Sequence, residues 1–168
     1  MYRRSRNIPA ALVGWTILCA TALPAAAADR ASGTLSLSAA GGKVLPLEVR
    51  HGYFFEEPDP FGGEGRVRVL VLTDEDVRAK VEACDNARCA EFAAKNGLSV
   101  KLWSDGSPPA YWAHVEPMQY SAPLTGSSLD LEVDTPERVS GTIELDSDSV
   151  RATVSFDLSR LATFATLD

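Results

Sequence analysis

The sequence predicts a mainly β domain, at the margin of α+β: a single antiparallel β-sandwich or barrel-like sheet of about eight strands, with one helical hairpin inserted near residues 74–96. Three observations lead to this prediction. Apolar and polar residues alternate with period two over much of the chain, as in half-buried strands. One segment has helical spacing instead. Without its N-terminal leader the chain has about 140 residues, which suits one domain with one core.

The leader, residues 1–28, has the three parts of a secretory signal peptide. Three arginines form a basic start, an apolar stretch follows, and alanines at 26–28 supply the small residues of a cleavage site. We therefore expect a cleaved signal over 1–28 and a mature, single β-rich domain over 29–168, located in the periplasm or secreted. We expect no stable membrane insertion once the signal is cleaved.

The leader has three alternative interpretations. An uncleaved membrane anchor is the main alternative, although the apolar stretch over 8–23 is short for a bilayer span. Arg3 and Arg4 resemble a twin-arginine signal, but the hydrophobic residues expected just after such a pair are missing. Leu18 stands before Cys19 where a lipid-anchored protein needs a small residue, which excludes lipid anchoring.

The first part of the mature chain contains three expected strands. Residues 34–38 form a short one, and after a Gly-Gly turn the alternating residues of 45–55 predict one long strand. Residues 66–72 are apolar on both faces towards their end. We therefore place this third strand centrally in the sheet, where both of its faces are covered.

The segment 73–97 breaks the alternation and predicts a helix, an interruption and a second short helix. Thr73 is the expected N-cap, with acidic residues filling the first turn. Val77 and Val81 follow at helical spacing, and the Asn-Gly pair at 96–97 suits a C-cap.

The mature chain keeps two cysteines, Cys84 and Cys89, because Cys19 leaves with the signal. An even pair in an exported protein predicts a disulfide. In a continuous helix the two Cα atoms would lie about 8.7 Å apart, whereas a disulfide needs them within about 6.8 Å. The helix must therefore break at Asp85-Asn86. The spacing differs from that of a C-x-x-C redox pair, and no second pair is present to complete a zinc site.

The second part of the chain returns to alternation and completes the eight expected strands. Its five segments are 98–103, 111–116, 129–134, 139–145 and 150–158. The polar residues 146–149 suit a hairpin turn between the last two strands.

The charge of the mature chain limits its partners. Residues 29–168 hold 13 basic and 23 acidic residues, a net charge of −10. Nucleic acid and anionic membrane surfaces need a basic face, so we expect neither as a partner. Such acidity either attracts a basic partner or only keeps the protein soluble.

The clearest candidates for ligand binding are Trp103, Trp112, Lys101 and His114. If 98–103 and 111–116 form a hairpin, we expect Trp103 opposite Trp112 and Lys101 opposite His114, all on the face away from the core. Two neighbouring tryptophans would stack on sugars or grip a peptide, and Lys101 would orient an anionic group. The alternative is that the helical insert or the N-terminal strand covers the tryptophans.

Phe61 lies beside an acidic run and is a further candidate for recognition. Together with Phe54 and Phe55 it would form a second recognition loop. The alternative is an ordinary loop with an anchoring aromatic residue.

The sequence predicts no catalytic residue, no metal site and no cofactor. It has no nucleophile elbow, and Cys84 and Cys89 pair with each other. The leading interpretation is an exported binding domain whose partner is an envelope protein or polysaccharide. The first alternative is a small envelope hydrolase that uses carboxylates near His51–Asp59, and the second is a structural or stress-related envelope protein.

Overall fold

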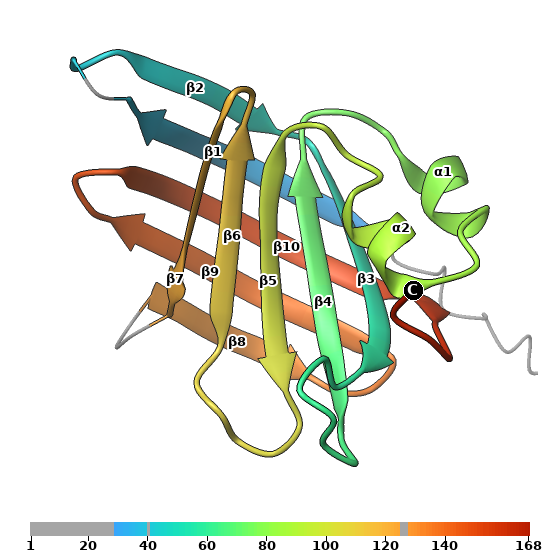
Figure 1. Cartoon of the computed structure of the whole chain (residues 1–168). Helices are drawn as coiled ribbons and strands as arrows, with labels where there is room; N and C mark the ends of the chain where they lie inside the picture. Colours follow the sequence, from blue (N-terminus) through green and yellow to red (C-terminus); the bar gives the residue numbers. More distant parts are fainter. Residues whose placement is uncertain (1–28, 40, 125–127) are drawn as a thin grey trace, which may run out of the picture.

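The computed structural model describes residues 29–39, 41–124 and 128–168, so the expected signal peptide over 1–28 lies outside the described residues. The described chain forms ten strands and two short helices (Figure 1). In order they are β1 (Arg30–Ser38), β2 (Val44–Val49), β3 (His51–Pro58), β4 (Arg66–Thr73), α1 (Arg78–Glu82), α2 (Ala87–Glu91), β5 (Gly97–Trp103), β6 (Ala110–Val115), β7 (Met118–Pro123), β8 (Leu129–Asp134), β9 (Arg138–Asp146) and β10 (Val150–Thr163). None of the helices in the described ranges is long and apolar enough to cross a membrane.

The strands form one curled sheet with two layers, joined by the long strand β10. Along its first part β10 pairs antiparallel with β1 and β9. Further on it pairs with β3, from Arg160 to Thr163, in a parallel register. One layer is therefore β2-β1-β10-β9-β8, and the other continues from β10 through β3, β4, β5, β6 and β7. The mainly β fold is confirmed, but the expectation that all strands are antiparallel is wrong for the β10–β3 pair.

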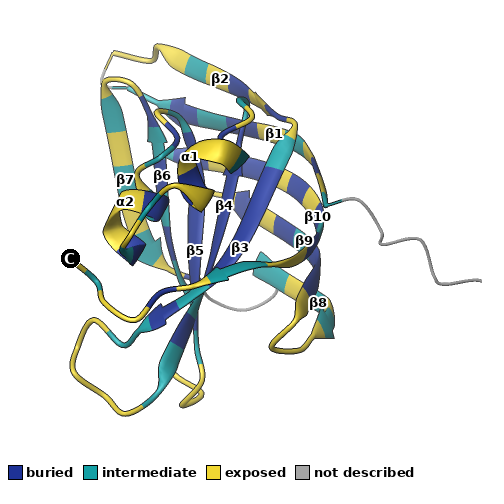
Figure 2. Ribbon diagram, turned by 90° about the vertical axis from the view of Figure 1, so that its right-hand side faces the viewer, coloured by how far each residue is buried: buried dark blue, intermediate teal, exposed yellow. Residues whose placement is uncertain are grey.

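The main core lies between the two layers, whose strands cross each other in Figure 1. Leu35 of β1 and Ile143 of β9 face Phe54 of β3 and Leu70 of β4 in this core, and all four are fully or almost fully buried. Alternation along each strand sends every second side chain into this space. Figure 2 shows the resulting change between buried and exposed residues along the strands.

A second buried cluster lies on the outer face of the β3–β4–β5 layer. Val69 and Phe55 of this face are covered by Val81 of α1, by Ala90 of α2 and by Phe164 of the segment after β10. The rings of Phe55 and Phe164 meet edge to face at 5.3 Å between centroids. β4 is thus buried on both faces, as its apolar sequence predicts.

The single long strand expected over 45–55 is wrong, because the chain passes from one layer to the other at Arg50. β2 before this point pairs with β1, and β3 after it pairs with β4. Val49 accordingly packs in the core between the layers, while Tyr53 packs under the helices. The alternation of apolar and polar residues continues past Arg50, so the sequence does not indicate that the chain changes layer there.

The helical insert begins later and ends earlier than its sequence predicts. Thr73 ends β4, and its hydroxyl donates a hydrogen bond to the carbonyl of Asn96 at 2.7 Å, so it is not an N-cap. The N–H of Val77, which precedes α1, donates to the Tyr53 hydroxyl at 2.9 Å. The carboxylate of Asp76 accepts from the Arg78 N–H at 3.1 Å and from the Tyr53 hydroxyl at 2.8 Å, so Asp76 and a tyrosine from β3 together bind the start of α1. Gly97 begins β5 and is not part of a helix end.

The expected disulfide is confirmed. Cys84 and Cys89 are joined, with their Cα atoms 5.6 Å apart. The helix is interrupted between α1 and α2, as the distance limit requires. Asn86 caps α2, because its side-chain oxygen accepts a hydrogen bond from the Cys89 N–H at 2.9 Å. The bond fixes a sharp corner between two helices of only five residues each.

Replacing both cysteines by serine is expected to lower the free energy of unfolding by about 2 kcal/mol, because the closed ring is small. Urea unfolding of the wild type and of the Cys84→Ser, Cys89→Ser variant measures the difference. A reducing agent should lower the stability of the wild type to that of the variant and leave the variant unchanged. Equal stability of the two proteins under oxidising conditions would contradict a stabilising disulfide.

Candidate functional site

The β5–β6 hairpin carries all four predicted ligand-binding residues on the predicted face, but its register differs from the prediction by four residues. Ser99 lies opposite Trp112, and Lys101 lies opposite Ala110, so neither expected pair forms. In the expected register, residue 116 belongs to the second strand of the hairpin and pairs with Ser99. It lies instead in the tight turn to β7, a strand that the sequence did not predict. Trp103 and Trp112 are therefore separated.

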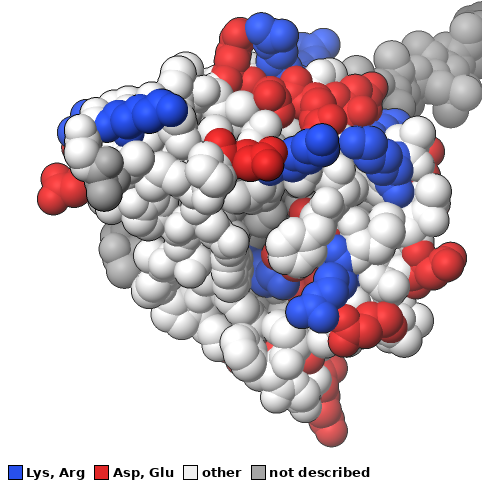
Figure 3. All heavy atoms as spheres, turned by 45° about the horizontal axis from the view of Figure 1, so that its top comes forward, with Lys and Arg blue, Asp and Glu red and all other residues white. Residues whose placement is uncertain are grey.

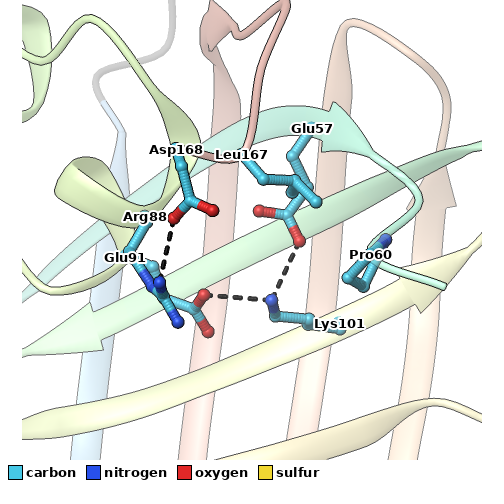
Figure 4. Close-up of a pocket in the computed structure, with 7 residues that line it drawn as sticks. All are labelled: Glu57, Pro60, Arg88, Glu91, Lys101, Leu167 and Asp168. Atoms are coloured by element: carbon cyan, nitrogen blue, oxygen red, sulfur yellow. Dashed lines mark hydrogen bonds and ion pairs between the residues drawn. The ribbon is translucent and has the colours of Figure 1, made fainter. Parts of the chain in front are cut away.

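Lys101 is buried beneath α2 between two carboxylates (Figure 4). Its Nζ lies 2.9 Å from Oε1 of Glu57 on β3 and 3.0 Å from Oε2 of Glu91 on α2. The side chains of Lys101 and Glu57 are only 10% and 1% exposed. The ammonium also lies 5.4 Å from the centroid of the Trp112 ring, within the range of a cation–π contact.

Burial and the neighbouring charges have opposite effects on the pKa values of Glu57 and Lys101. Burial raises the pKa of the Glu57 carboxyl, although the hydrogen bond from Lys101 acts against the rise. Burial also disfavours the charged form of Lys101. The hydrogen bond to Glu57 and the attraction of Glu91 outweigh it and raise the pKa of the ammonium. Lys101 therefore carries a charge that this chain's own carboxylates already neutralise, and it does not face an external anion.

A hollow of about 280 Å³ lies beside the pair, as Figure 4 shows. Its lining residues are Glu57, Pro60, Arg88, Glu91, Lys101, Leu167 and Asp168. Arg88 pairs with Asp168 at 2.9 Å, so each charged residue of the lining has a partner of opposite charge. We interpret this cluster as the polar connection that holds α2 against the sheet.

A second hollow, which we call the aromatic hollow, lies between the β3–β4 and β5–β6 loops, which are adjacent at the bottom of Figure 1. Its volume is about 380 Å³, and its lining residues are Asp59, Phe61, Trp103, Asp105, Ser107 and Pro108. The rings of Phe61 and Trp103 are stacked, with centroids 6.4 Å apart and planes inclined by 22°. Phe61 is nevertheless 84% exposed.

Hydrogen bonds within each loop hold the aromatic hollow in shape. The Asp59 carboxylate accepts from the Phe61 N–H at 2.8 Å. The Asp105 carboxylate accepts from the N–H and the hydroxyl of Ser107 at 2.8 and 2.9 Å. These bonds, led by the one from the backbone, lower the pKa of Asp105, so it is ionised at neutral pH. From the sequence, Phe61 is a predicted recognition residue and Trp103 a predicted ligand-binding residue, each on its own, and their contact comes only from the fold.

Trp112 and His114 line a third, smaller hollow of about 170 Å³ with residues of the helical insert, among them Phe92 and Ala94. Nε2 of His114 lies 3.4 Å from the carbonyl oxygen of Ala94. The insert therefore covers part of Trp112, which is half-buried. This is the alternative that the sequence analysis left open for the tryptophans, and it applies to Trp112.

The carboxylates near His51–Asp59 do not converge. Glu56 and Glu57 project to opposite faces of β3, since successive side chains alternate. Glu56 pairs with Arg160 at 3.0 Å. Within the part of the chain that the structure describes, no group of three or more His, Cys, Asp or Glu residues is placed to hold a metal ion.

Comparisons of the chain with protein-family models, with curated proteins and with solved structures found no match. No relative therefore indicates a function. A proposal of function has to rest on the geometry of the three hollows described above. The third hollow also has an exposed aromatic residue, Phe92, which is 64% exposed. Among the three hollows, only the aromatic hollow combines an exposed ring, that of Phe61, with a second ring stacked on it and with loops held by their own hydrogen bonds.

Replacing Lys101 by methionine is expected to lower the free energy of unfolding by about 3 kcal/mol, because it leaves two buried carboxylates without a cation. The matched control is Lys80→Met, whose exposed pair with Glu75 should contribute less than about 1 kcal/mol. Urea unfolding at neutral pH measures both variants.

The same Lys101→Met variant should become more stable as the pH falls from neutral towards the ordinary pKa of glutamate. The folded-state pKa of Glu57 is raised, so the folded chain takes up a proton before the unfolded chain does. Adding Glu57→Gln to Lys101→Met should remove most of this dependence. A variant whose stability is independent of pH over this interval would show that Glu57 is not an uncompensated buried charge.

Proposed function

We propose that this chain is an exported binding domain that contacts its partner, an envelope protein or polysaccharide, through the aromatic hollow. The observation that carries the proposal is the position of Phe61. Its ring is stacked on Trp103, yet 84% of the residue remains in contact with solvent. An exposed aromatic ring that is already ordered loses little conformational freedom on binding and gains from burial.

Export is supported by two features of the sequence and structure. The leader over 1–28 has the composition of a signal peptide. The disulfide between Cys84 and Cys89 is the kind of bond that persists in an oxidising compartment. The domain that remains after cleavage, 29–168, contains all described strands and helices and both buried clusters.

Binding is favoured over catalysis by the way the carboxylates of the aromatic hollow are used. Asp59 and Asp105 both accept hydrogen bonds from their own loops. The lowered pKa of Asp105 suits a fixed negative charge and not a general acid, which must hold a proton near neutral pH. A hydrolase based on the residues near His51 has no comparable support, because those carboxylates point apart.

Replacing Phe61 by serine is expected to abolish capture of the partner and to change stability by less than about 0.5 kcal/mol, because the residue is exposed. Residues 29–168 serve as the bait in a pull-down from envelope extract, with Phe61→Ser beside it. The matched control is Val44→Ser, which removes an apolar side chain that is 54% exposed at the start of β2.

Val44→Ser should retain the partner, since the β1–β2 hairpin lies at the other end of the molecule from the β3–β4 loop (Figure 1). A partner captured equally by the Phe61→Ser variant would exclude the aromatic hollow as the contact site.

A further inference from the structure

The chemistry of the aromatic hollow selects the group that would occupy it. Of its six lining residues two are acidic and none is basic. Elsewhere the charges are mixed: on the face shown in Figure 3, basic and acidic side chains lie interleaved. Within the hollow, ionised carboxylates can only accept hydrogen bonds. The two carboxylates therefore favour an occupant that is positively charged and donates hydrogen bonds.

The two rings add a requirement on shape. Phe61 and Trp103 are inclined by only 22°, so together they present roughly parallel ring faces beside the two carboxylates. A planar cation can stack on an aromatic face and donate in its own plane to a carboxylate. Guanidinium has this geometry, with five N–H donors and no acceptor. An ammonium is a compact point charge and stacks less well.

The aromatic hollow fits a neutral sugar less well. A sugar hydroxyl both donates and accepts, and sites that recognise it need donors as well as acceptors. Here both carboxylates are acceptors, and the only side-chain donors among the lining residues are the Trp103 indole N–H and the Ser107 hydroxyl. The Ser107 hydroxyl, the only hydroxyl among the lining residues, already donates to Asp105.

We infer that the aromatic hollow binds an arginine side chain from a basic segment of the partner protein. This inference rests on the proposed function and names the partner's chemistry. Phe61 and Trp103 contact the guanidinium plane, and Asp59 and Asp105 accept its N–H groups. The net charge of −10 on residues 29–168 attracts a basic segment over longer distances.

The test uses a short glycine-rich peptide that carries two arginines, with lysine and glutamine versions as comparisons. Binding to residues 29–168 is followed by NMR through the tryptophan indole N–H signals. This part of the chain has two tryptophans, and they lie in different hollows, so Trp112 is an internal control for Trp103. The arginine peptide should shift the Trp103 signal and leave that of Trp112 in place. Lysine should bind more weakly than arginine, and glutamine more weakly still.

The variant for this test is Asp59→Asn, Asp105→Asn. Asparagine keeps an oxygen that can accept the hydrogen bonds from the backbone N–H groups of Phe61 and Ser107, and it removes the charge. The affinity for the arginine peptide should fall about fivefold in this variant. It should also fall in the wild type when NaCl is raised from roughly 50 to 300 mM.

Three results would overturn the inference: equal binding of the glutamine peptide, a shift confined to Trp112, or no shift of Trp103 with the arginine peptide. The pull-down separates these failures from failure of the proposed function. If Phe61→Ser loses the partner but the arginine peptide does not bind, the proposed function stands and the arginine inference is wrong. If the arginine peptide binds but Phe61→Ser still captures the partner, the hollow recognises arginine and the proposed function is wrong.

Discussion

β10 is hydrogen-bonded along its first part to β1 and β9 and along its last part to β3, so one strand belongs to both layers of the sheet. Because its 14 residues are shared in this way, the sheet has to curl over itself and enclose the core between the layers. The same strand brings the segment after it to the outer face of β3, where Phe164 packs against Phe55. Both the main core and the second cluster therefore depend on this pairing.

The second layer carries apolar side chains on both faces, and the outer face needs a cover. The short helices α1 and α2 provide it, although neither is long enough to be stable alone. Connections that hold them in place include the Cys84–Cys89 bond, the hydrogen bond from Val77 to Tyr53, and the ion pair of Lys101 with Glu91 of α2. The backbone N–H groups of Ala87 and Arg88 also donate to carbonyl groups of the segment after β10. The cover leaves the loop end of the layer open, where Phe61 and Trp103 remain accessible.

The candidate site shows where prediction from sequence reaches its limit. Successive side chains of β5 and β6 alternate between the two faces of the sheet, and this local property of a strand places Lys101, Trp103, Trp112 and His114 on one face. Their pairing depends on the turn to β7, a strand that the sequence does not predict. Phe61 is a predicted candidate, but its stacking on Trp103 joins a loop to the end of β5, 42 residues further along the sequence.

The sequence by itself determined the mainly β class, the helical insert, the disulfide with its helix break and the central position of β4. Each of these follows from spacing, composition or a distance limit within one segment. Tertiary structure alone decided the crossing between layers at Arg50, the partners of Lys101 and the separation of the two tryptophans. The physical reason is that period two fixes only the face on which a side chain lies, whereas register and layer are set by contacts between distant segments.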